Sequence, residues 1–330
     1  MRNLVRSFVS GTILAASLAL ATAALAQASG QSSGQTSGQT SGQTSGQASG
    51  QASGQTPVPS APPAATSGPP MRGLPDPYVG KKKLLVVADV QTGFQHNSIN
   101  HAMATIERMG RESGFYVAFL RTDSQLITRE PIVGVGARYS GRSVNARNLN
   151  DFDAIFFLGS GEGTLSDAQK ADLLAFVSEG KGFIAGHAAT VAFYNWPEYG
   201  EMIGGFMDGE FPVQPTGLIV QDRAFPGAEQ FPTEFSDQFP YLKAPYDRGD
   251  VHTIIRLDPA RLTPEQLARR PDGDFPVVWA KPYGQGRVFV SSLGHLDEPW
   301  DDPAVQALYL GGIKWALGLV DTPIPLDPRT

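Results

Sequence analysis

The sequence predicts a doubly wound α/β fold, in which helices cover both faces of a mainly parallel sheet. Three observations indicate this fold: short continuous apolar runs, helical segments between them, and glycines where a run or a helix ends. The chain has 330 residues, 41% of them hydrophobic, which is enough for one large globular domain and further segments.

Strands and helices are expected to alternate along the first part of this domain. The segment KKKLLVVADV holds the first strand, because its apolar run Leu84–Val87 is typical of a strand buried on both faces. The segment NSINHAMATIERMG predicts a helix capped near Asn97 or Ser98 and closed by Gly110. FYVAFLR, FDAIFFLGS and GFIAGH are the next three expected strands.

A second helix is predicted in SDAQKADLLAFVSEG, with Ser166 or Asp167 as its cap and Gly180 as its end. Later β-prone pieces, TGLIVQD, HTIIRL, FPVVWAK and GRVFVSSLG, lie between Pro- and Gly-rich turns. We therefore expect residues 200–280 to add loops and strands around the carboxyl end of the sheet, within one domain. A helix over about 303–317 closes the pattern.

Residues 1–26 are typical of a secretory signal peptide. Two arginines precede an apolar stretch, and the small residues Ala24 and Ala26 frame a cleavage site before Gln27. An uncleaved membrane anchor is the alternative, and no later segment of the sequence is a transmembrane candidate. The prediction is a periplasmic or secreted protein.

Residues 27–80 form a low-complexity linker. The triplet Ser-Gly-Gln recurs seven times at a spacing of four residues, and the stretch then becomes rich in proline. Such a composition cannot bury enough apolar area to offset the entropy of ordering, so we expect a disordered tether.

Composition excludes two classes of function. With 26 Lys and Arg against 32 Asp and Glu, the net charge is −6 and no basic stripe is present, so nucleic acid is not an expected partner. The chain contains no cysteine, which excludes disulfides and a thiol nucleophile.

Polar side chains follow several of the expected strands, at the point where each strand ends. They are His96 after the first strand, Glu162 after the third, His187 after the fourth and His295 after GRVFVSSLG. In open α/β sheets ligands bind where the carboxyl ends of the strands meet, so these side chains are predicted to surround one pocket.

Each histidine also has a structural interpretation. His96 could cap the following helix, His187 could pack beneath a loop, and His295 could bind backbone groups in a turn. His101 is expected to be structural or on the surface, and His252 is expected to be structural. Singly, each of the three would be read as structural; together, they predict a site.

Several ordered segments resemble the ThuA-like (trehalose-utilisation) family. They are GFQHNSI, GSGEGTLSDAQKADLLAFVSEGKGFIAGHAAT, WPEYGEMIGGFMDGEF, FPVVWAKPYGQGRVFVSSLGH and DPAVQALYLGGIKWALG. The resemblance runs from about Lys82 to Gly318 and implies a flavodoxin-like sheet similar to that of class I glutamine amidotransferases. It implies a ThuA-like domain over 81–320 and leaves 321–330 as a C-terminal tail.

The resemblance places the family's motif histidines at His96, His187 and His295. In amidotransferases a nucleophilic cysteine occupies the turn where this chain has GHAAT, so glutamine hydrolysis through a Cys-His-Glu triad is excluded here. No Gly-x-Ser-x-Gly nucleophile elbow follows any of the expected strands either. Acid–base chemistry and metal chemistry therefore remain as the mechanisms open to this site.

The chain departs from the family pattern at three places. Where relatives read Gly-His-Pro after GGxFDG, it has Glu210; where they read Asp-Glu, it has Asp237 followed by Gln238; and a later His-Pro pair becomes Phe225-Pro226. Glu210 can still bind a divalent metal through oxygen, so His96, His187 and Glu210 are a candidate set of ligands for zinc. The same residues would serve equally well without a metal, as a base and hydrogen-bond donors around a sugar.

The remaining candidates complete a carbohydrate site. The expected catalytic residues are His187, His96, His295 and Asp237. The expected substrate-binding residues are Phe94, Glu162, Tyr194, Trp196 and Tyr246, although the segment that holds Tyr194 and Trp196 could equally be a hydrophobic lid.

The family context implies carbohydrate metabolism. The prediction is a protein that acts on a glycoside or a 3-keto-disaccharide by acid–base or metal-assisted hydrolysis, or by a related step, with a small-molecule carbohydrate as its partner. The alternatives are a non-catalytic sugar-binding module and a tethered interaction protein.

Overall fold

The structure is a computed structural model that describes residues 76–329 except 143 and 145. The described residues all belong to one compact unit, Pro63–Thr330. The predicted signal peptide and nearly all of the predicted tether lie outside them. Within the described part of the chain, no helix is long and apolar enough to cross a membrane.

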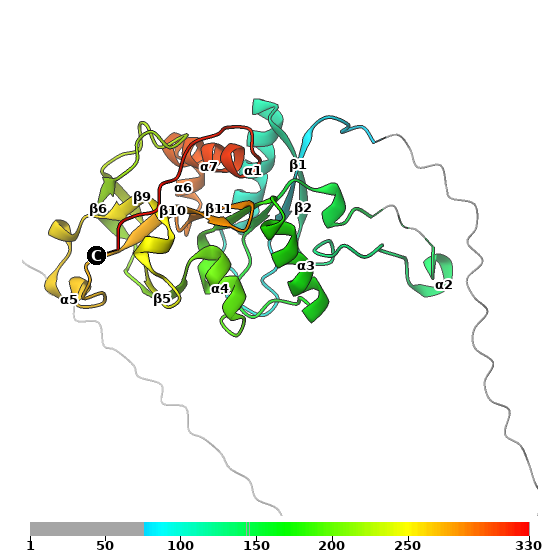
Figure 1. Ribbon diagram of the computed structural model, residues 1–330, viewed down its shortest axis with the longest axis horizontal. Helices are drawn as coiled ribbons and strands as arrows, with labels where there is room; N and C mark the ends of the chain where they lie inside the picture. The colour runs from blue at the N-terminus through cyan, green and yellow to red at the C-terminus, as the bar shows by residue number, and fades with distance from the viewer. Residues whose placement is uncertain (1–75, 143, 145, 330) are drawn as a thin grey trace, which may run out of the picture. The chain divides into compact units, whose positions relative to one another are not determined.

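A nine-stranded sheet runs through the unit, and five parallel strands form one half of it (Figure 1). Their order β2-β1-β3-β4-β11 is that of a flavodoxin-like doubly wound sheet, which confirms the predicted fold class. The strands are β1 (Lys82–Val87), β2 (Tyr116–Arg121), β3 (Ala154–Phe157), β4 (Gly182–Gly186) and β11 (Gly286–Ser291).

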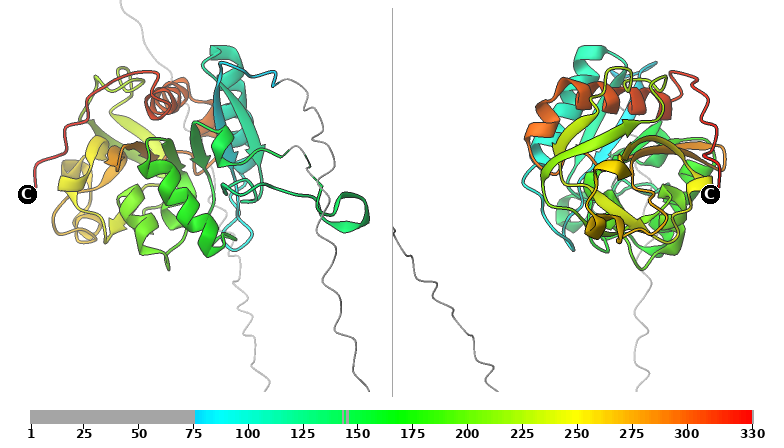
Figure 2. Two further views of the ribbon diagram at one scale, coloured as in Figure 1. Left: turned by 45° about the vertical axis from the view of Figure 1, so that its right-hand side comes forward. Right: turned by 90° about the vertical axis from the view of Figure 1, so that its left-hand side faces the viewer.

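The central parallel strands are apolar because both of their faces are buried. All four residues of β3 and all five of β4 are buried, as is the Leu84–Val87 run of β1. On one face they contact α1 (Ile99–Ser113) and α7 (Pro303–Ala316), with the short α6 (Glu298–Asp301) between them. On the other face lie α3 (Asp167–Ser178) and α4 (Pro197–Ile203), as Figures 1 and 2 show.

The helix ends agree only partly with the sequence. α3 begins with a capping box in which the Ser166 hydroxyl accepts from the Gln169 backbone N–H, as the prediction of Ser166 as a cap requires. The predicted end of α1 at Gly110 is wrong, because the helix continues to Ser113 and ends at the left-handed Gly114 (φ 71°). Gly110 serves packing instead, since a Cβ there would lie 2.5 Å from the ring of Tyr116.

The other half of the sheet is antiparallel, with β10 beside β11 and the order β10-β9-β6-β7 outward to the edge. Three of the β-prone segments predicted after residue 200, TGLIVQD, HTIIRL and FPVVWAK, thus extend the sheet sideways, whereas GRVFVSSLG forms β11 of the parallel half. These strands are β6 (Gln214–Val220), β7 (Glu234–Asp237), β9 (His252–Leu257) and β10 (Pro276–Tyr283). A separate two-stranded sheet pairs β5 (Phe206–Glu210) with β8 (Pro240–Lys243).

Short elements complete the unit. The one-turn helices are α2 (Gly136–Tyr139), on an arm that projects beyond β2 in Figure 1, and α5 (Pro264–Leu267). The 3₁₀ turns are η1 (Leu149–Asp151), η2 (His187–Val191), η3 (Arg248–Asp250) and η4 (Pro259–Arg261). The predicted C-terminal tail packs at the start of β9, where the Asp327 backbone N–H donates at 2.8 Å to the carbonyl of Val251, the residue before the strand.

Candidate functional site

His187 begins the turn that follows β4. Its φ of 35° lies in the left-handed region that a non-glycine residue rarely adopts, and η2 starts at this residue. The preceding Gly186 has no room for a side chain, because a Cβ would lie 2.6 Å from the ring of Phe156. The strand therefore ends in a sharp turn that presents the imidazole at the carboxyl edge of the sheet.

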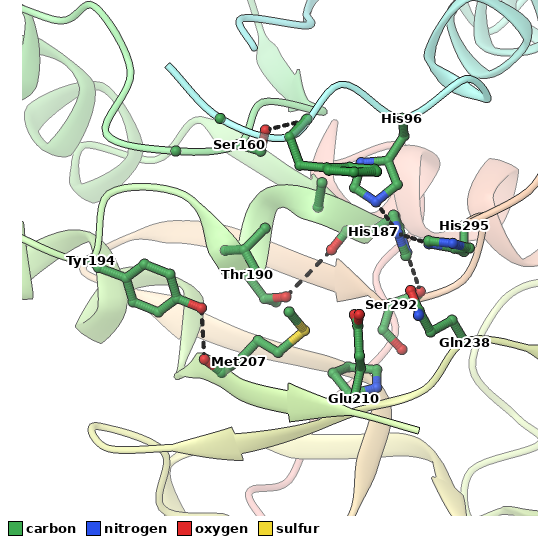
Figure 3. A pocket seen from close by; sticks show the side chains of 16 residues that line it. His96, Ser160, His187, Thr190, Tyr194, Met207, Glu210, Gln238, Ser292 and His295 are labelled. Carbon is green, nitrogen blue, oxygen red and sulfur yellow. Dashed lines mark hydrogen bonds between the residues drawn. The ribbon is translucent and has the colours of Figure 1, made fainter. Parts of the chain in front are cut away.

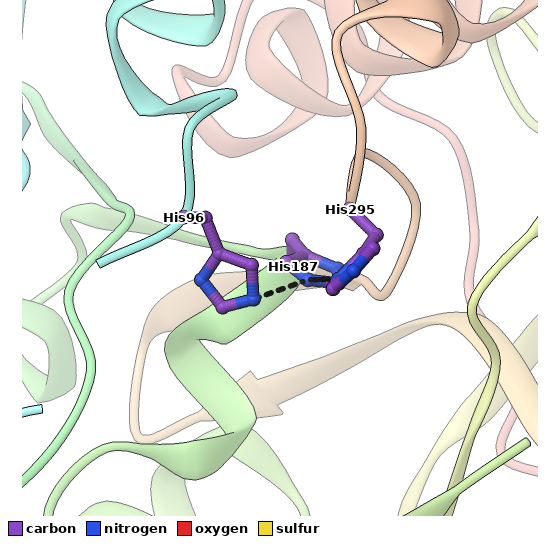
Figure 4. Close-up of side chains that lie close together, drawn as sticks. All are labelled: His96, His187 and His295. Carbon is purple, nitrogen blue, oxygen red and sulfur yellow. Dashed lines mark hydrogen bonds between the residues drawn. The ribbon is translucent and has the colours of Figure 1, made fainter. Parts of the chain in front are cut away.

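Three histidines from distant parts of the chain converge at this edge. The Nε2 atom of His187 lies 3.2 Å from Nε2 of His96 and 3.1 Å from Nδ1 of His295 (Figure 4). The rings meet edge to face, with centroids 4.7 Å apart for His96 and His187 and 5.1 Å apart for the two other pairs. The structure thus brings together the three histidines that the sequence analysis selected.

The hydrogen bonds of His187 fix its tautomer. Its Nδ1 lies 2.8 Å from the backbone carbonyl oxygen of Ser292, which can only accept, so Nδ1 carries the hydrogen. In the neutral ring Nε2 then offers a lone pair, and this atom is the one that faces His96 and His295.

Burial keeps the three imidazoles neutral. It lowers the pKa of His187 to about 3, with the charge that His96 would carry as the next cause. It lowers the pKa of His96 to about 4 and also lowers that of His295, although the Glu210 carboxylate raises the latter. At neutral pH the site therefore presents uncharged nitrogens, whose lone pairs can bind a proton or a metal.

Asp237 holds the loop that carries His295. Its buried carboxylate accepts the backbone N–H groups of Gly294 at 2.7 Å and of His295 at 3.3 Å. Burial raises the pKa of Asp237 to about 6, against the lowering effect of these hydrogen bonds. From the opposite side the Ser98 hydroxyl donates to the carbonyls of Gly294 and His295, each at 3.1 Å. The loop is thus fixed from two elements.

The histidines lie in the wall of a pocket of about 580 Å³. Figure 3 shows it opening over the end of β4, with β5 and the loop after η2 opposite the histidines. The side chains and backbone that line it are Gly93, Phe94, His96, Ser160, Gly161, His187, Ala188, Thr190, Val191, Tyr194, Met207, Glu210, Gln238, Pro240, Ser292 and His295.

Two of the predicted substrate-binding residues line this pocket. The ring of Phe94 is 68% exposed and lies edge to face with His96, at 4.7 Å between centroids. Tyr194 is 38% exposed, and its hydroxyl donates to the Met207 carbonyl at 2.7 Å. Both rings can therefore contact a ligand in the pocket.

The other three predicted substrate-binding residues are not among those that line it. Glu162 is exposed between the left-handed Gly161 and Gly163 and accepts the Asn195 backbone N–H at 3.3 Å. Trp196 packs into the core on Phe193 and Tyr199, which agrees with the hydrophobic-lid alternative for its segment.

Tyr246 belongs to a different cavity, where its hydroxyl donates to Asp274 at 2.5 Å and Arg270 lies 4.8 Å from its ring. Asp237, predicted as catalytic, also does not line the site pocket. Its carboxylate is turned to the backbone of the histidine loop, so the structure gives it a positioning contact.

Sequence reasoning missed several residues of the pocket. Ser292 contributes through its backbone carbonyl, and the hydroxyl of Thr190 and the thioether of Met207 face the cavity in Figure 3. A carbonyl leaves no signal in a sequence. Gln238 appeared only as a departure from the family pattern, yet its buried Oε1 has no hydrogen-bond partner among the described residues.

Among the described residues, the group that could hold a metal ion is His96, His187 and His295, whose ligand atoms all lie within 4.8 Å of one another. The third member is therefore His295, where the sequence analysis expected Glu210. Tetrahedral zinc with bonds of 2.0–2.1 Å places its ligand nitrogens about 3.3 Å apart, which is close to the 3.1 and 3.2 Å separations here. The Nδ1–H bond of His187 to Ser292 is the outer contact that histidine ligands usually make.

Fold and site together define a flavodoxin-like α/β protein with a three-histidine pocket at the carboxyl edge of its parallel strands. The chain belongs to the ThuA family, described as trehalose utilisation, whose sequence profile matches residues 83–316. This membership gives the chain a role related to carbohydrate metabolism.

Two solved structures of ThuA-like proteins are similar to this chain. The protein from Bacteroides uniformis ATCC 8492 has a TM-score of 0.53 at 19% identity, covering 74% of this chain and 95% of that chain. The protein from Parabacteroides merdae ATCC 43184 has a TM-score of 0.50 at 18% identity, covering 76% and 95%. At these identities the likeness shows the fold alone. None of the curated proteins compared with the chain matches it.

Proposed function

We propose that this protein binds a glycoside or a 3-keto-disaccharide in the histidine pocket and hydrolyses it, or carries out a related acid–base step. The observation that carries the proposal is the convergence of three neutral histidines, from the ends of three strands, in one cavity. Family membership supports the carbohydrate class of the substrate.

The pocket suits a ligand of this size. Its volume of about 580 Å³ lies in the range of roughly 300–1,000 Å³ that small-molecule sites occupy. Phe94 and Tyr194 offer apolar ring surface for the face of a sugar, while Gln238, Thr190 and Glu210 offer groups that can bond to hydroxyls.

We also propose that His96, His187 and His295 hold a divalent metal ion, with zinc as the first candidate. When bound, such an ion polarises a carbonyl or a water molecule. Neighbouring residues orient the histidine ligands: Ser292 fixes the tautomer of His187, and Asp237 and Ser98 fix the backbone at His295. Without a metal the same neutral nitrogens can accept hydrogen bonds from sugar hydroxyls.

One observation favours a second function, a sugar-binding module that has lost catalysis. The family pattern has a carboxylate after Asp237, where this chain has the neutral Gln238 with its unpartnered buried oxygen. An amide there can bind a hydroxyl but cannot exchange a proton.

Turnover assays with trehalose and 3-keto-trehalose, beside calorimetry with the same sugars, decide between these functions. Turnover supports the enzyme, and heat of binding without turnover supports the module. Neither signal with any form of the protein, including zinc-loaded protein, favours the tethered interaction protein and contradicts the proposal.

We propose a periplasmic or secreted location, which rests on the signal-peptide pattern of residues 1–26. Cell fractionation of the full-length chain tests it, together with the N-terminal sequence of the product, which should begin at Gln27. Recovery of the uncleaved chain in the cytoplasm contradicts it.

A further inference from the structure

A β-bulge decides where Glu210 points. In the antiparallel pair of β5 and β8, Met207 faces Leu242 and Gly209 faces Tyr241, so Asp208 is the extra residue. In a regular strand, residues three apart lie on opposite faces, whereas here both Met207 and Glu210 line the histidine pocket. The bulge therefore turns the Glu210 side chain into the site.

The bulge is held in place on both sides. A Cβ on Gly209 would lie 2.1 Å from the Tyr241 hydroxyl, so glycine allows the close approach of this ring to the strand. The Tyr194 hydroxyl donates to the Met207 carbonyl at 2.7 Å, and the Phe211 N–H donates to the Phe239 carbonyl at 2.9 Å. Glu210 thus lies between two anchored residues, Met207 within β5 and Phe211 directly after it.

The carboxylate of Glu210 lines the same pocket as the three histidines without joining their group. It is not part of the three-histidine group, and no hydrogen bond or ion pair of the described residues engages it. In Figure 3 its carboxylate is directed from β5 toward the histidines and the cavity between them.

The histidines leave one task in the proposed reaction unassigned. The only N–H of neutral His187 is committed to the Ser292 carbonyl, and its Nε2 faces the two other rings. Hydrolysis needs a group that removes a proton from water and returns it to the leaving oxygen. Of the residues that line the pocket, Glu210 is the one that carries a carboxylate.

We propose that Glu210 is the proton-transfer residue of this site. It accepts the proton of a water molecule positioned at the three histidines while the water oxygen forms a bond to the reacting carbon. The bond from that carbon to the leaving oxygen then breaks, and the same proton passes from Glu210 to the leaving oxygen. This inference rests on the proposed function.

The strand supplies a matched control. Asp208 is also exposed and acidic, but it is the bulged residue, is absent from the pocket lining and lies 4.0 Å from the Lys243 ammonium. Asp208→Asn therefore removes the same charge two residues away without touching the cavity.

The test compares Glu210→Gln, Glu210→Asp and Asp208→Asn with the wild-type protein on 3-keto-trehalose and trehalose. We expect Glu210→Gln to lower kcat by about 10²–10⁴-fold, with sugar affinity within about threefold and zinc content unchanged. Glu210→Asp should keep measurable turnover, and Asp208→Asn should behave as wild type. The melting temperature of each variant checks its fold.

Three results would overturn the inference. Wild-type turnover by Glu210→Gln shows that the carboxylate is not needed. Loss of zinc from this variant shows that Glu210 is a metal ligand instead. Absence of turnover by the wild-type protein removes the proposed function itself, and this outcome is distinct because it does not depend on any substitution.

Discussion

The Nδ1 atom of His187 lies 2.8 Å from the carbonyl oxygen of Ser292, and the sheet register explains why. In the parallel pair of β4 and β11, Gly186 is aligned with Ser291. The next residue of each strand leaves the sheet at the same point, which sets the imidazole beside the carbonyl. The register of two buried strands thereby fixes the tautomer of the central histidine.

Substitution of His187 separates catalysis from packing. His187→Ala should abolish turnover and cost about 1–3 kcal/mol of unfolding free energy, because the Ser292 carbonyl loses its donor. His187→Gly should be equally inactive but about 1 kcal/mol more stable than the alanine variant, since glycine accepts the φ of 35°. Urea unfolding and turnover are measured on both. A destabilised variant whose folded fraction is fully active would contradict a functional role for His187.

Acid should destabilise the metal-free protein through these histidines. The pKa values of His187 and His96 are lowered to about 3 and 4 in the folded chain. Below pH 6.5 these histidines therefore bind protons in the unfolded chain while they stay neutral in the folded chain. Their contribution is complete above that pH and is lost as the pH falls toward 4, by at most about 1.4 kcal/mol per pH unit for each histidine.

The contribution of Asp237 to stability depends on pH in the opposite way. Because its pKa is raised to about 6, the folded chain binds this proton at a higher pH than the unfolded chain does, which offsets part of the loss. The measurement is urea unfolding at pH 7, 6 and 5 in EDTA, for the wild type and for His187→Ala. The wild-type stability should fall more steeply. Parallel curves would mean that His187 is protonated freely in the folded state.

Zinc should stabilise the protein through the three histidines. At a free concentration 100 times its Kd, a ligand that binds only the folded state adds about 2.7 kcal/mol, so the melting temperature should rise with zinc and fall again with EDTA. His295→Ala should lose most of the effect. His101→Ala is the control, because His101 lies outside the site and contacts Asp301 at 2.8 Å. An equal loss in both variants would point to non-specific binding.

Asp237 should matter through the position of His295. In Asp237→Asn one oxygen becomes an NH₂ group, which cannot accept both the Gly294 and the His295 N–H groups. We expect zinc affinity or kcat to fall by about 10–100-fold, as for other outer contacts of metal ligands. Titration calorimetry with zinc is the check, and an unchanged affinity with full activity would assign Asp237 to folding alone.

The N-terminal segment should be dispensable for folding. Asp76 belongs to the folded domain, because its carboxylate pairs with Lys83 at 3.1 Å and Arg147 at 3.0 Å. A chain that begins at residue 76 should melt at the same temperature as the mature protein, whereas one that begins at Lys81 loses these contacts. A drop of several degrees for the first chain would show that the segment packs on the domain.

The parallel half of the fold could be predicted because its signals are local. The apolar runs of β1, β3 and β4 are buried on both faces, so burial and sequence pattern coincide. The antiparallel half pairs strands far apart in sequence, and the pattern gave its segments but not their order. The predicted end of α1 was wrong because Gly110 makes room for the ring of Tyr116. This contact cannot be deduced from the residues next to Gly110 in the sequence.

The histidines of the site could be predicted for the same reason, since each follows a strand and parallel strands end at one edge. The orientation of other side chains could not. Glu162 follows β3 as expected, but the left-handed Gly161 and Gly163 beside it set a local path that leaves it out of the pocket. Glu210 enters the pocket only because of a bulge, and Asp237 turns to a loop 57 residues away in sequence.

The hydrogen bonds that Asp237 accepts from the loop of His295 also limit how this protein can be shortened or combined with other proteins. β7 is the outermost strand of the antiparallel half, yet its last residue holds the loop that follows the parallel strand β11. A truncated protein with only the five parallel strands would retain His96, His187 and His295 in its sequence and lose the support of the third. The edge that carries the three histidines therefore depends on both halves of the sheet and cannot be transferred to another protein with the parallel half alone.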